Sequence, residues 1–317
     1  MSFENRSTAP ELLIHVLREG LTESIHHCQA VVADSRGRSL AMAGNSPTPV
    51  FARSALKPFQ ALAMLSTGIR ERYRLSEKDI AIMCGSHQGT TAHARQVFSI
   101  LWRADLSPDL LVCPTPPGKP SPLCHNCSGK HAGMLVASRA QNWTLSDYAQ
   151  RQHPVQALVR AKLADLLQMP SEEFLFARDD CGVPTYQLQL NHLASLFAQL
   201  TAGERPDLES VARAMTHHPE MVAGQGCFDT ELMRATQGDL VSKSGAEGIQ
   251  CIGRVGEGMG LAIKVQDGAA RAKYALALHL LQRMGWIQPA AAEMLGERFL
   301  RVGPYTRLEV EGELRMP

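Results

Sequence analysis

The stretch Ala52-Arg53-Ser54-Ala55-Leu56-Lys57-Pro58 decides how this sequence is interpreted. It holds the pattern S-x-x-K at the start of residues 54–67, whose apolar positions recur near helical spacing. Residues three apart on a helix share a face, so the amine of Lys57 can reach the hydroxyl of Ser54. A lysine kept neutral there can act as the base that activates the serine. The same pattern also fits a capping serine followed by a solvated lysine.

A second motif, Lys243-Ser244-Gly245, lies far downstream on a predicted strand. S-x-x-K followed by K-[ST]-G is the layout of the penicillin-binding and serine β-lactamase group. In that layout the strand's lysine faces the site, and a nearby backbone N–H helps to form the oxyanion hole. Ser86-His87-Gln88 lies between the two motifs as a possible second serine motif, although it is not S-D-N. Together the motifs favour a serine hydrolase over the alternative that Lys243 is a charge at a strand edge.

Strands are predicted near both ends of the chain and helices between them. The predicted strands cover 28–33, 39–43, 248–255 and 260–265, and 306–314 adds an edge strand. The predicted helices cover 54–67, 77–83 (or a buried strand), 91–106, 129–139 after a Ser128 cap, 154–167, 188–200, 207–215 and 269–284. This order favours an α+β fold over repeated βαβ units. We predict one domain over 1–317, with a sheet from about 20–50 and 240–285 and a helical part at about 54–235.

Composition and charge argue against several classes of protein. Lys plus Arg number 32 against 31 Asp plus Glu, so the chain has no electrostatic footprint for nucleic acid or an anionic membrane. No apolar stretch approaches the ~20 residues of a membrane helix. The first residues show no basic region followed by an apolar one, as a secretory signal would. We therefore expect a cytoplasmic protein with reduced thiols.

A cluster of cysteines and histidines spans residues 124–131, which read Cys-His-Asn-Cys-Ser-Gly-Lys-His, and Asp179-Asp180-Cys181-Gly182 follows later. Thiolates and imidazoles are good zinc ligands, and C-x-x-C is half of a familiar zinc site. The chain has no matching second C-x-x-C, so we do not expect a four-cysteine zinc. A mixed site on Cys127, Cys181 and a third group, a redox dithiol, and plain reduced cysteines all stay open.

Six blocks, in this order, carry a resemblance to a known family. They are Ala52–Pro58, Cys84-Gly85-Ser86-His87, residues 126–134 (Asn-Cys-Ser-Gly-Lys-His-Ala-Gly-Met), Asp180-Cys181-Gly182-Val183-Pro184-Thr185, residues 218–224 (His-Pro-Glu-Met-Val-Ala-Gly) and residues 243–248 (Lys-Ser-Gly-Ala-Glu-Gly). The series resembles the Rhizobium-type L-asparaginases, also called the asparaginase II or class 3 family, over roughly residues 20–285.

The resemblance implies hydrolysis of L-asparagine to L-aspartate and ammonia by a homodimer with a serine β-lactamase or glutaminase-like fold. It implies two Ser–Lys pairs and a zinc ion whose ligands are completed by water. Carried onto this sequence, the pairs are Ser54 with Lys57 and Ser86 with Lys243, the zinc ligands are Cys127, Lys130 and Cys181, and Asp179 and His131 lie around the metal and the substrate. In one departure, Asp229 stands where some relatives have a cysteine near the metal, with Cys227 two residues earlier.

We predict an acyl-enzyme mechanism in which Ser54 is the preferred nucleophile and Lys57 its base. Arg53 and His87 flank the two serines, so we expect them to bind or orient the substrate carboxylate; a surface ion pair is the alternative for Arg53. Three other functions stay open. They are an L-glutaminase, which differs by one methylene of substrate, a penicillin-interacting serine hydrolase, and a catalytically silent zinc-binding or regulatory protein.

Overall fold

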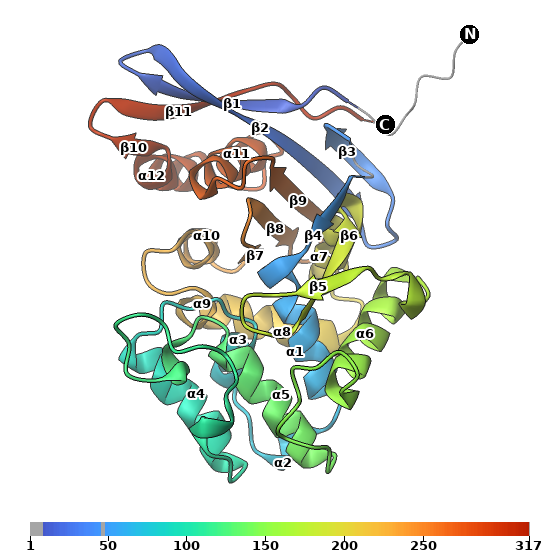
Figure 1. The fold of residues 1–317 in the computed structure, drawn as a ribbon. Coiled ribbons are helices and arrows are strands. Elements are labelled where there is room, and N and C mark those ends of the chain that lie inside the picture. The colour runs from blue at the N-terminus through green and yellow to red at the C-terminus, as the bar shows by residue number, and fades with distance from the viewer. Residues whose placement is uncertain (1–8, 46–47, 317) are drawn as a thin grey trace. The chain divides into compact units, whose positions relative to one another are not determined.

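The computed structural model describes residues 9–45 and 48–316, and the chain divides into two compact units (Figure 1). The unit that we call the sheet unit consists of Met1–Ala55, Leu188–Glu204 and Glu231–Pro317. The helical unit consists of Leu56–Gln187 and Arg205–Thr230. That all of this forms one domain stays a prediction.

The sheet unit is built on an eight-stranded antiparallel sheet. Its strand order is β10-β11-β1-β2-β9-β8-β7, and β3 pairs with β2. The strands are β1 (Leu12–Arg18), β2 (Leu21–Asp34), β3 (Ser39–Ala43), β7 (Leu240–Ser244), β8 (Ile249–Arg254), β9 (Met259–Val265), β10 (Arg301–Gly303) and β11 (Thr306–Glu311). The short strand β4 (Pro49–Phe51) also belongs to this unit. The predicted α+β class with an antiparallel sheet is confirmed.

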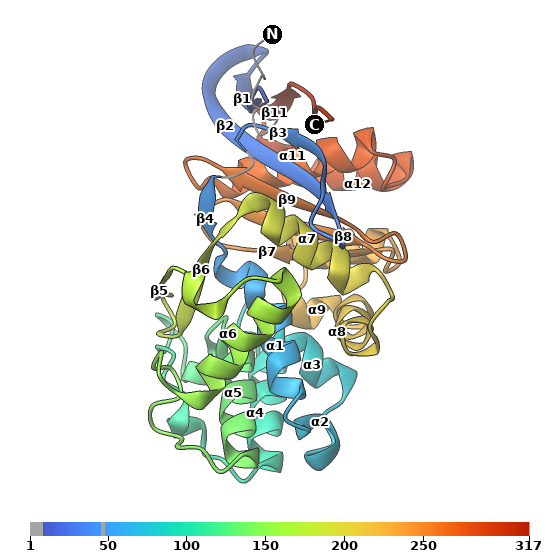
Figure 2. The ribbon, with the colours of Figure 1, turned by 90° about the vertical axis from the view of Figure 1, so that its right-hand side faces the viewer.

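Helices cover the sheet on both faces, as Figure 2 shows. Helix α7 (Leu190–Thr201) packs on β2, β8 and β9, while α11 (Ala270–Arg283) packs on β1, β8, β9 and β11 and carries α12 (Pro289–Phe299). Double coverage explains why β8 and β9 are buried along almost their whole length. Gly260 permits the approach of α7, because a Cβ there would lie 2.0 Å from the carbonyl oxygen of Ala194.

Three details of the sheet differ from the sequence-based expectation. Strand β1 was not predicted, although it pairs with both β2 and β11. Strand β11 is not at the edge of the sheet, because the three-residue β10 lies outside it. Helix α7 comes from the stretch assigned to the helical part, but its apolar side packs on the sheet. Local periodicity identified the helix and could not show which surface it covers.

The helical unit is arranged around α5 (Ser128–Ala140), which is buried at every position except Arg139. This helix contacts α1 (Lys57–Leu65), α2 (Ile69–Arg72), α3 (Glu77–Met83), α4 (Thr91–Arg103) and α6 (Pro154–Leu167). A Cβ at Gly129 would lie 2.1 Å from the carbonyl oxygen of Ile82, so the glycine allows α5 to approach α3 closely. The expected Ser128 cap is wrong: Cys127 takes the N-cap position, and the Ser128 hydroxyl instead donates to the Leu123 carbonyl.

The remaining elements are short or peripheral. They are α8 (Pro206–His217), α9 (Pro219–Val222), β5 (Phe176–Arg178) paired with β6 (Pro184–Gln189), α10 (Phe228–Ala235), and the 3-10 helices Arg53–Leu56, Pro108–Leu110, Pro122–Cys124 and Ser171–Glu173. In the part of the chain that the structure describes, every helix is too short or too polar to cross a membrane.

Candidate active site

Lys57, the lysine of S-x-x-K, is completely buried at the start of α1. Its Nζ lies 2.6 Å from the carbonyl oxygen of Gly85, 3.2 Å from that of Asn126 and 2.9 Å from the Oγ of Ser86. The interpretation of Lys57 as a solvated lysine is therefore wrong. Within the helical unit, the structure brings Lys57 of S-x-x-K together with Ser86 of Ser86-His87-Gln88.

The loop that carries Ser86 is fixed by close backbone packing. The Ser86 N–H donates to the carbonyl of Val222 at 2.7 Å. A Cβ at Gly85 would lie 2.6 Å from the carbonyl oxygen of Met221. Gly89 has a φ of +63°, and a Cβ there would lie 2.0 Å from the carbonyl oxygen of Cys124. Since any side chain at these glycines would collide with backbone, the loop holds Ser86 in one place.

His87 is buried behind the same loop, and both of its ring nitrogens have partners within the helical unit. The Gly89 N–H donates to Nδ1 at 3.1 Å, which assigns the ring proton to Nε2, and Nε2 lies 3.1 Å from the Ser128 Oγ. Burial, followed by the charges of His93 and Lys57, holds the pKa of His87 well below its ordinary value. A neutral His87 thus connects the serine loop to α5, and its predicted contact with substrate stays a prediction.

The neutral His87 gives the protein a defined acid sensitivity. In the unfolded chain a histidine titrates near pH 6.5. Below that pH the unfolded state therefore binds a proton at residue 87, whereas His87 in the native state stays neutral. Stability should therefore fall as the pH falls below about 6.5, by up to ~1.4 kcal/mol per pH unit for each such histidine. We expect His87→Gln to make this slope shallower by about that amount, measured as the free energy of urea unfolding between about pH 5 and pH 6.5. Parallel slopes in the two proteins would contradict it.

In the sheet unit, the other two catalytic candidates lie on neighbouring pieces of chain. Ser54 follows Arg53, whose φ of 49° is strained for a side chain with a Cβ. Lys243 lies on β7, at the end of the strand order, yet it is completely buried, with its Nζ 2.7 Å from the Ser244 carbonyl oxygen. A Cβ at Gly245 would lie 3.2 Å from the carbonyl oxygen of Ala52. The K-S-G motif thus lies beside the chain that leads into Ser54.

The predicted Ser–Lys pairs join residues of the two units. Ser54 with Lys57 and Ser86 with Lys243 therefore stay predictions, as does substrate binding by the half-buried Arg53.

The three predicted metal ligands gather at the start of α5. Cys127 and Lys130 are three residues apart and share a face of the helix, and Cys181 lies in a tight turn in which the Gly182 N–H donates to the carbonyl of Asp179. The Nζ of Lys130 lies 3.1 Å from the Sγ of Cys181. All three side chains are buried.

Mutual interaction shifts the charges of these ligands. The pKa of Cys181 is lowered to about 5, and the largest cause is a hydrogen bond from the Cys127 thiol. Burial acts in the opposite direction, and the charge of Lys130 lowers the pKa further. Burial alone would lower the pKa of Lys130, but the charges of Cys181, Cys127 and Asp179 outweigh it and raise that pKa. The group therefore contains a thiolate at neutral pH, which is the form that binds metals.

Once Lys130 has lost its ammonium proton, which the charge of a bound ion would favour, the donor set is one that zinc accepts, because soft sulfur and nitrogen atoms suit this ion. Cys127, Lys130 and Cys181 would hold the ion, and the Nζ of Lys130 and the Sγ of Cys181 already lie 3.1 Å apart. The described residues hold no group of three His, Cys, Asp or Glu side chains placed for a metal. The predicted ligand set contains two cysteines, Cys127 and Cys181, and its third member is Lys130.

Residues that the sequence analysis missed surround the ligands. The hydroxyl of Tyr148 accepts the Val112 N–H and lies 2.8 Å from the Nδ1 of His131. The Nε2 of His131 is buried and has no partner among the described residues. Cys113 is buried nearby, where burial and the charges of Cys127 and Cys181 raise its pKa to about 12. Tyr148 lies 17 residues after His131 in the sequence. No sequence pattern indicates that the two side chains are in contact.

The departure at residues 227–229 lies in the helical unit. Asp229 is buried, while Cys227 is half-buried and accepts a hydrogen bond from the Nε2 of Gln88 at 3.1 Å. Cys227 therefore supports the residue that follows Ser86 and His87.

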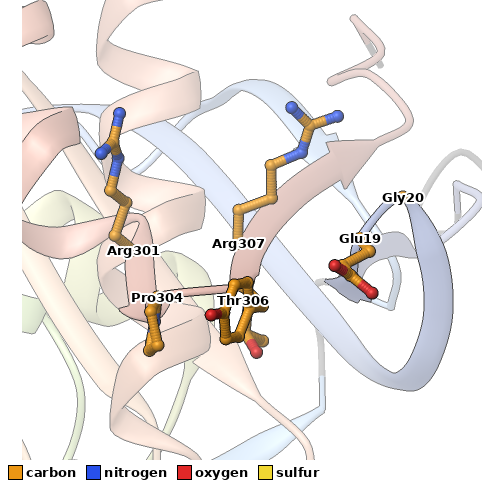
Figure 3. Close-up of a pocket in the computed structure, with 8 residues that line it drawn as sticks. Glu19, Gly20, Arg301, Pro304, Thr306 and Arg307 are labelled. Carbon is orange, nitrogen blue, oxygen red and sulfur yellow. The ribbon is translucent and has the colours of Figure 1, made fainter.

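A separate hollow lies in the sheet unit, between the β1–β2 turn and the β10–β11 turn (Figure 3). It is lined by Glu19, Gly20, Arg301, Pro304, Thr306 and Arg307, among others. None of the predicted site residues lines it.

A family model described as L-asparaginase II matches residues 14–316, almost the whole chain. A comparison with curated proteins finds no match. Among solved structures, one described as Mglu in its native form is 14% identical, with a TM-score of 0.42 over 82% of this chain and 65% of that one. A structure from Bacteroides dorei DSM 17855, whose description suggests a beta-lactamase, is 13% identical, with a TM-score of 0.39 over 82% of this chain and 86% of that one. The chain spans 65% of the length of the Mglu chain.

Proposed function

Because the chain belongs to the L-asparaginase II family, we propose that it hydrolyses the side-chain amide of L-asparagine to L-aspartate and ammonia. The family itself supports a hydrolase acting on amides. The observation that carries the finer proposal is the buried Lys57, whose amine lies 2.9 Å from the Ser86 hydroxyl within a fixed loop. A buried amine beside a hydroxyl is what a Ser–Lys hydrolase requires.

As a general base, Lys57 would act as a neutral amine. Such an amine has two N–H groups and one lone pair. In that form the carbonyls of Gly85 and Asn126 can accept the two N–H groups, which leaves the lone pair for the Ser86 hydroxyl at 2.9 Å. In this form Lys57 can take a proton from a serine, which is the step that makes the serine oxygen a nucleophile.

The proposed reaction proceeds in two steps. Lys57 takes the proton of Ser54 while the serine oxygen bonds to the amide carbon of asparagine, and backbone N–H groups at Ser54 and near Ser244–Gly245 stabilise the oxyanion. The carbon–nitrogen bond then breaks, and Ser86 with Lys243 passes a proton to the departing ammonia. Water next attacks the ester, giving aspartate and free Ser54.

Zinc and the substrate-binding residues complete the proposal. Cys127, Lys130 and Cys181 would hold the ion, whose positive charge would position the substrate. The buried Nε2 of His131, which has no partner among the described residues, supports the predicted place of His131 near substrate or metal. Asp179 and Arg53 are proposed to bind the charged groups of asparagine. The homodimer and the cytoplasmic location stay predictions.

The direct test is ammonia release from L-asparagine and L-glutamine by the purified protein. We expect kcat/KM for asparagine to exceed that for glutamine by roughly 10- to 200-fold, because one methylene in a fitted pocket changes binding by ~1–3 kcal/mol. Equal rates would instead assign a glutaminase–asparaginase. If neither amide is cleaved by protein whose circular dichroism shows an intact fold, the proposal fails, and labelling of a serine by penicillin becomes the test of the alternative hydrolase.

A further inference from the structure

A buried lysine outside every motif contacts the hairpin of β7 and β8, which carries Lys243-Ser244-Gly245 and which we call the K-S-G hairpin. Lys273 lies on α11 and is 4% exposed. Its Nζ is 2.8 Å from the carbonyl oxygen of Gly245 and 3.3 Å from that of Ile249. The Gly245 N–H donates to the same Ile249 carbonyl at 2.8 Å. The N–H and the carbonyl of Gly245 are thus both held by hydrogen bonds within the sheet unit.

This contact fixes the orientation of one peptide group. In a trans peptide the C=O and the following N–H point in opposite directions. Since the Gly245 carbonyl points to the Lys273 ammonium, the N–H of Ala246 points away from it. No described residue accepts the Ala246 N–H, and Ala246 is exposed. A backbone donor at the end of β7 is therefore left available on the opposite side of the peptide from α11.

We propose that Lys273 is a positioning residue for the oxyanion hole. By holding the Gly245 carbonyl, it presents the Ala246 N–H to the oxygen on which negative charge develops. Its positive charge, at the other end of the same peptide group, polarises that N–H further. This proposal rests on the proposed hydrolysis through β7.

A second lysine, Lys264 on β9, contacts the same hairpin and provides a matched control. The Nζ of Lys264 donates to the carbonyl of Glu247 at 2.6 Å and to that of Val265 at 2.7 Å. Lys264 thus holds the hairpin two residues beyond Gly245 and does not contact the Gly245–Ala246 peptide. If a lysine in this region only ties the hairpin to the sheet, both lysines should have the same effect on activity.

The experiment compares Lys273→Met and Lys264→Met in asparagine hydrolysis. We expect Lys273→Met to lower kcat by roughly 10²- to 10³-fold, as loss of one oxyanion donor does, with KM changed less than about 3-fold. Lys264→Met should stay within about 3-fold of the parent in kcat. Lys273→Gln keeps a donor amide and should recover part of the kcat, which keeps the proposal testable if the methionine variant does not fold.

A second readout follows the peptide itself. The carbonyl 13C chemical shift of Gly245 should move upfield in Lys273→Met and stay in place in Lys264→Met. If the shift moves while kcat does not, Lys273 only braces the hairpin and the proposal is overturned. A parent protein that cleaves no amide would remove the proposed function, whereas an active parent with an equally active Lys273→Met would remove only the role of Lys273.

Discussion

Lys57→Met is expected to lower kcat for asparagine hydrolysis by roughly 10²- to 10⁴-fold, the usual contribution of a general base. Methionine fills similar space in the buried position but cannot take a proton from Ser54 or Ser86. The measurement is steady-state ammonia release across a range of pH.

The same change has a structural cost that must be separated from catalysis. The carbonyls of Gly85 and Asn126 lose their lysine donor, at about 1–3 kcal/mol for each buried group left unsatisfied. Arg72→Met is a control for the loss of a side-chain donor at an exposed position, because Arg72 donates to the backbone carbonyl of Ala140 at 2.8 Å. Thermal melts of both variants show which fraction is folded. A folded Lys57→Met with kcat within tenfold of the parent would exclude Lys57 as the base.

The nucleophile is assigned with the two serine variants in the same assay. Ser54→Ala should leave no ester intermediate in quenched reactions, whereas Ser86→Ala should still form one slowly. Near-parental turnover in Ser54→Ala together with an inactive Ser86→Ala would reverse the assignment. The 2.9 Å contact of Lys57 with Ser86 makes this comparison necessary.

Cys181→Ser is expected to reduce bound zinc from stoichiometric to near zero, because the set has only two sulfur ligands and Cys181 carries the thiolate. Metal content by mass spectrometry after gel filtration measures this directly. The melting temperature should fall as well: a ligand at about 1,000 times its dissociation constant stabilises the native state by ~4 kcal/mol. A chelator should destabilise the parent in the same way and leave Cys181→Ser unaffected.

Cys113→Ser is the control for this experiment. Cys113 is a buried thiol close enough for the charges of Cys127 and Cys181 to raise its pKa, yet it is not a predicted ligand. The Cys113→Ser variant should retain stoichiometric zinc. Stoichiometric zinc in Cys181→Ser, or its loss in Cys113→Ser, would show that the ligand set is wrong.

The sequence predicted the parts of this structure that depend on local pattern. Helix α6 begins and ends at the predicted residues, since Pro154 follows a capping histidine and the apolar spacing continues to Leu167. Strand β1 escaped prediction because its half-buried positions form a pattern only once β2 and β11 lie on both sides of it. Tertiary packing, rather than propensity, determines such a strand.

The motif residues of the candidate site could be predicted from the sequence, but the contacts between them could not. The motifs identified Lys57, Lys130 and Lys243, and all three are buried, as chemistry at a lysine requires. The contact of Lys57 with Ser86 joins residues 29 apart, and that of Lys273 with Gly245 joins residues 28 apart. Neither spacing corresponds to a helical or strand repeat, so only the folded chain reveals them.

The pairing of β1 with β11 has a consequence for how the protein is made. Leu13 lies opposite Glu311, so the first strand of the sheet has its partner almost at the other end of the chain. At a synthesis rate of about 5–20 residues per second, β1 waits roughly 15–60 s on the ribosome before β11 emerges. During that interval the backbone groups that β1 will offer to β11 are open to any other strand, including one from a neighbouring nascent chain. The sheet can therefore close only after β11 has left the ribosome, and chaperones that cover a strand edge would act on β1 before then.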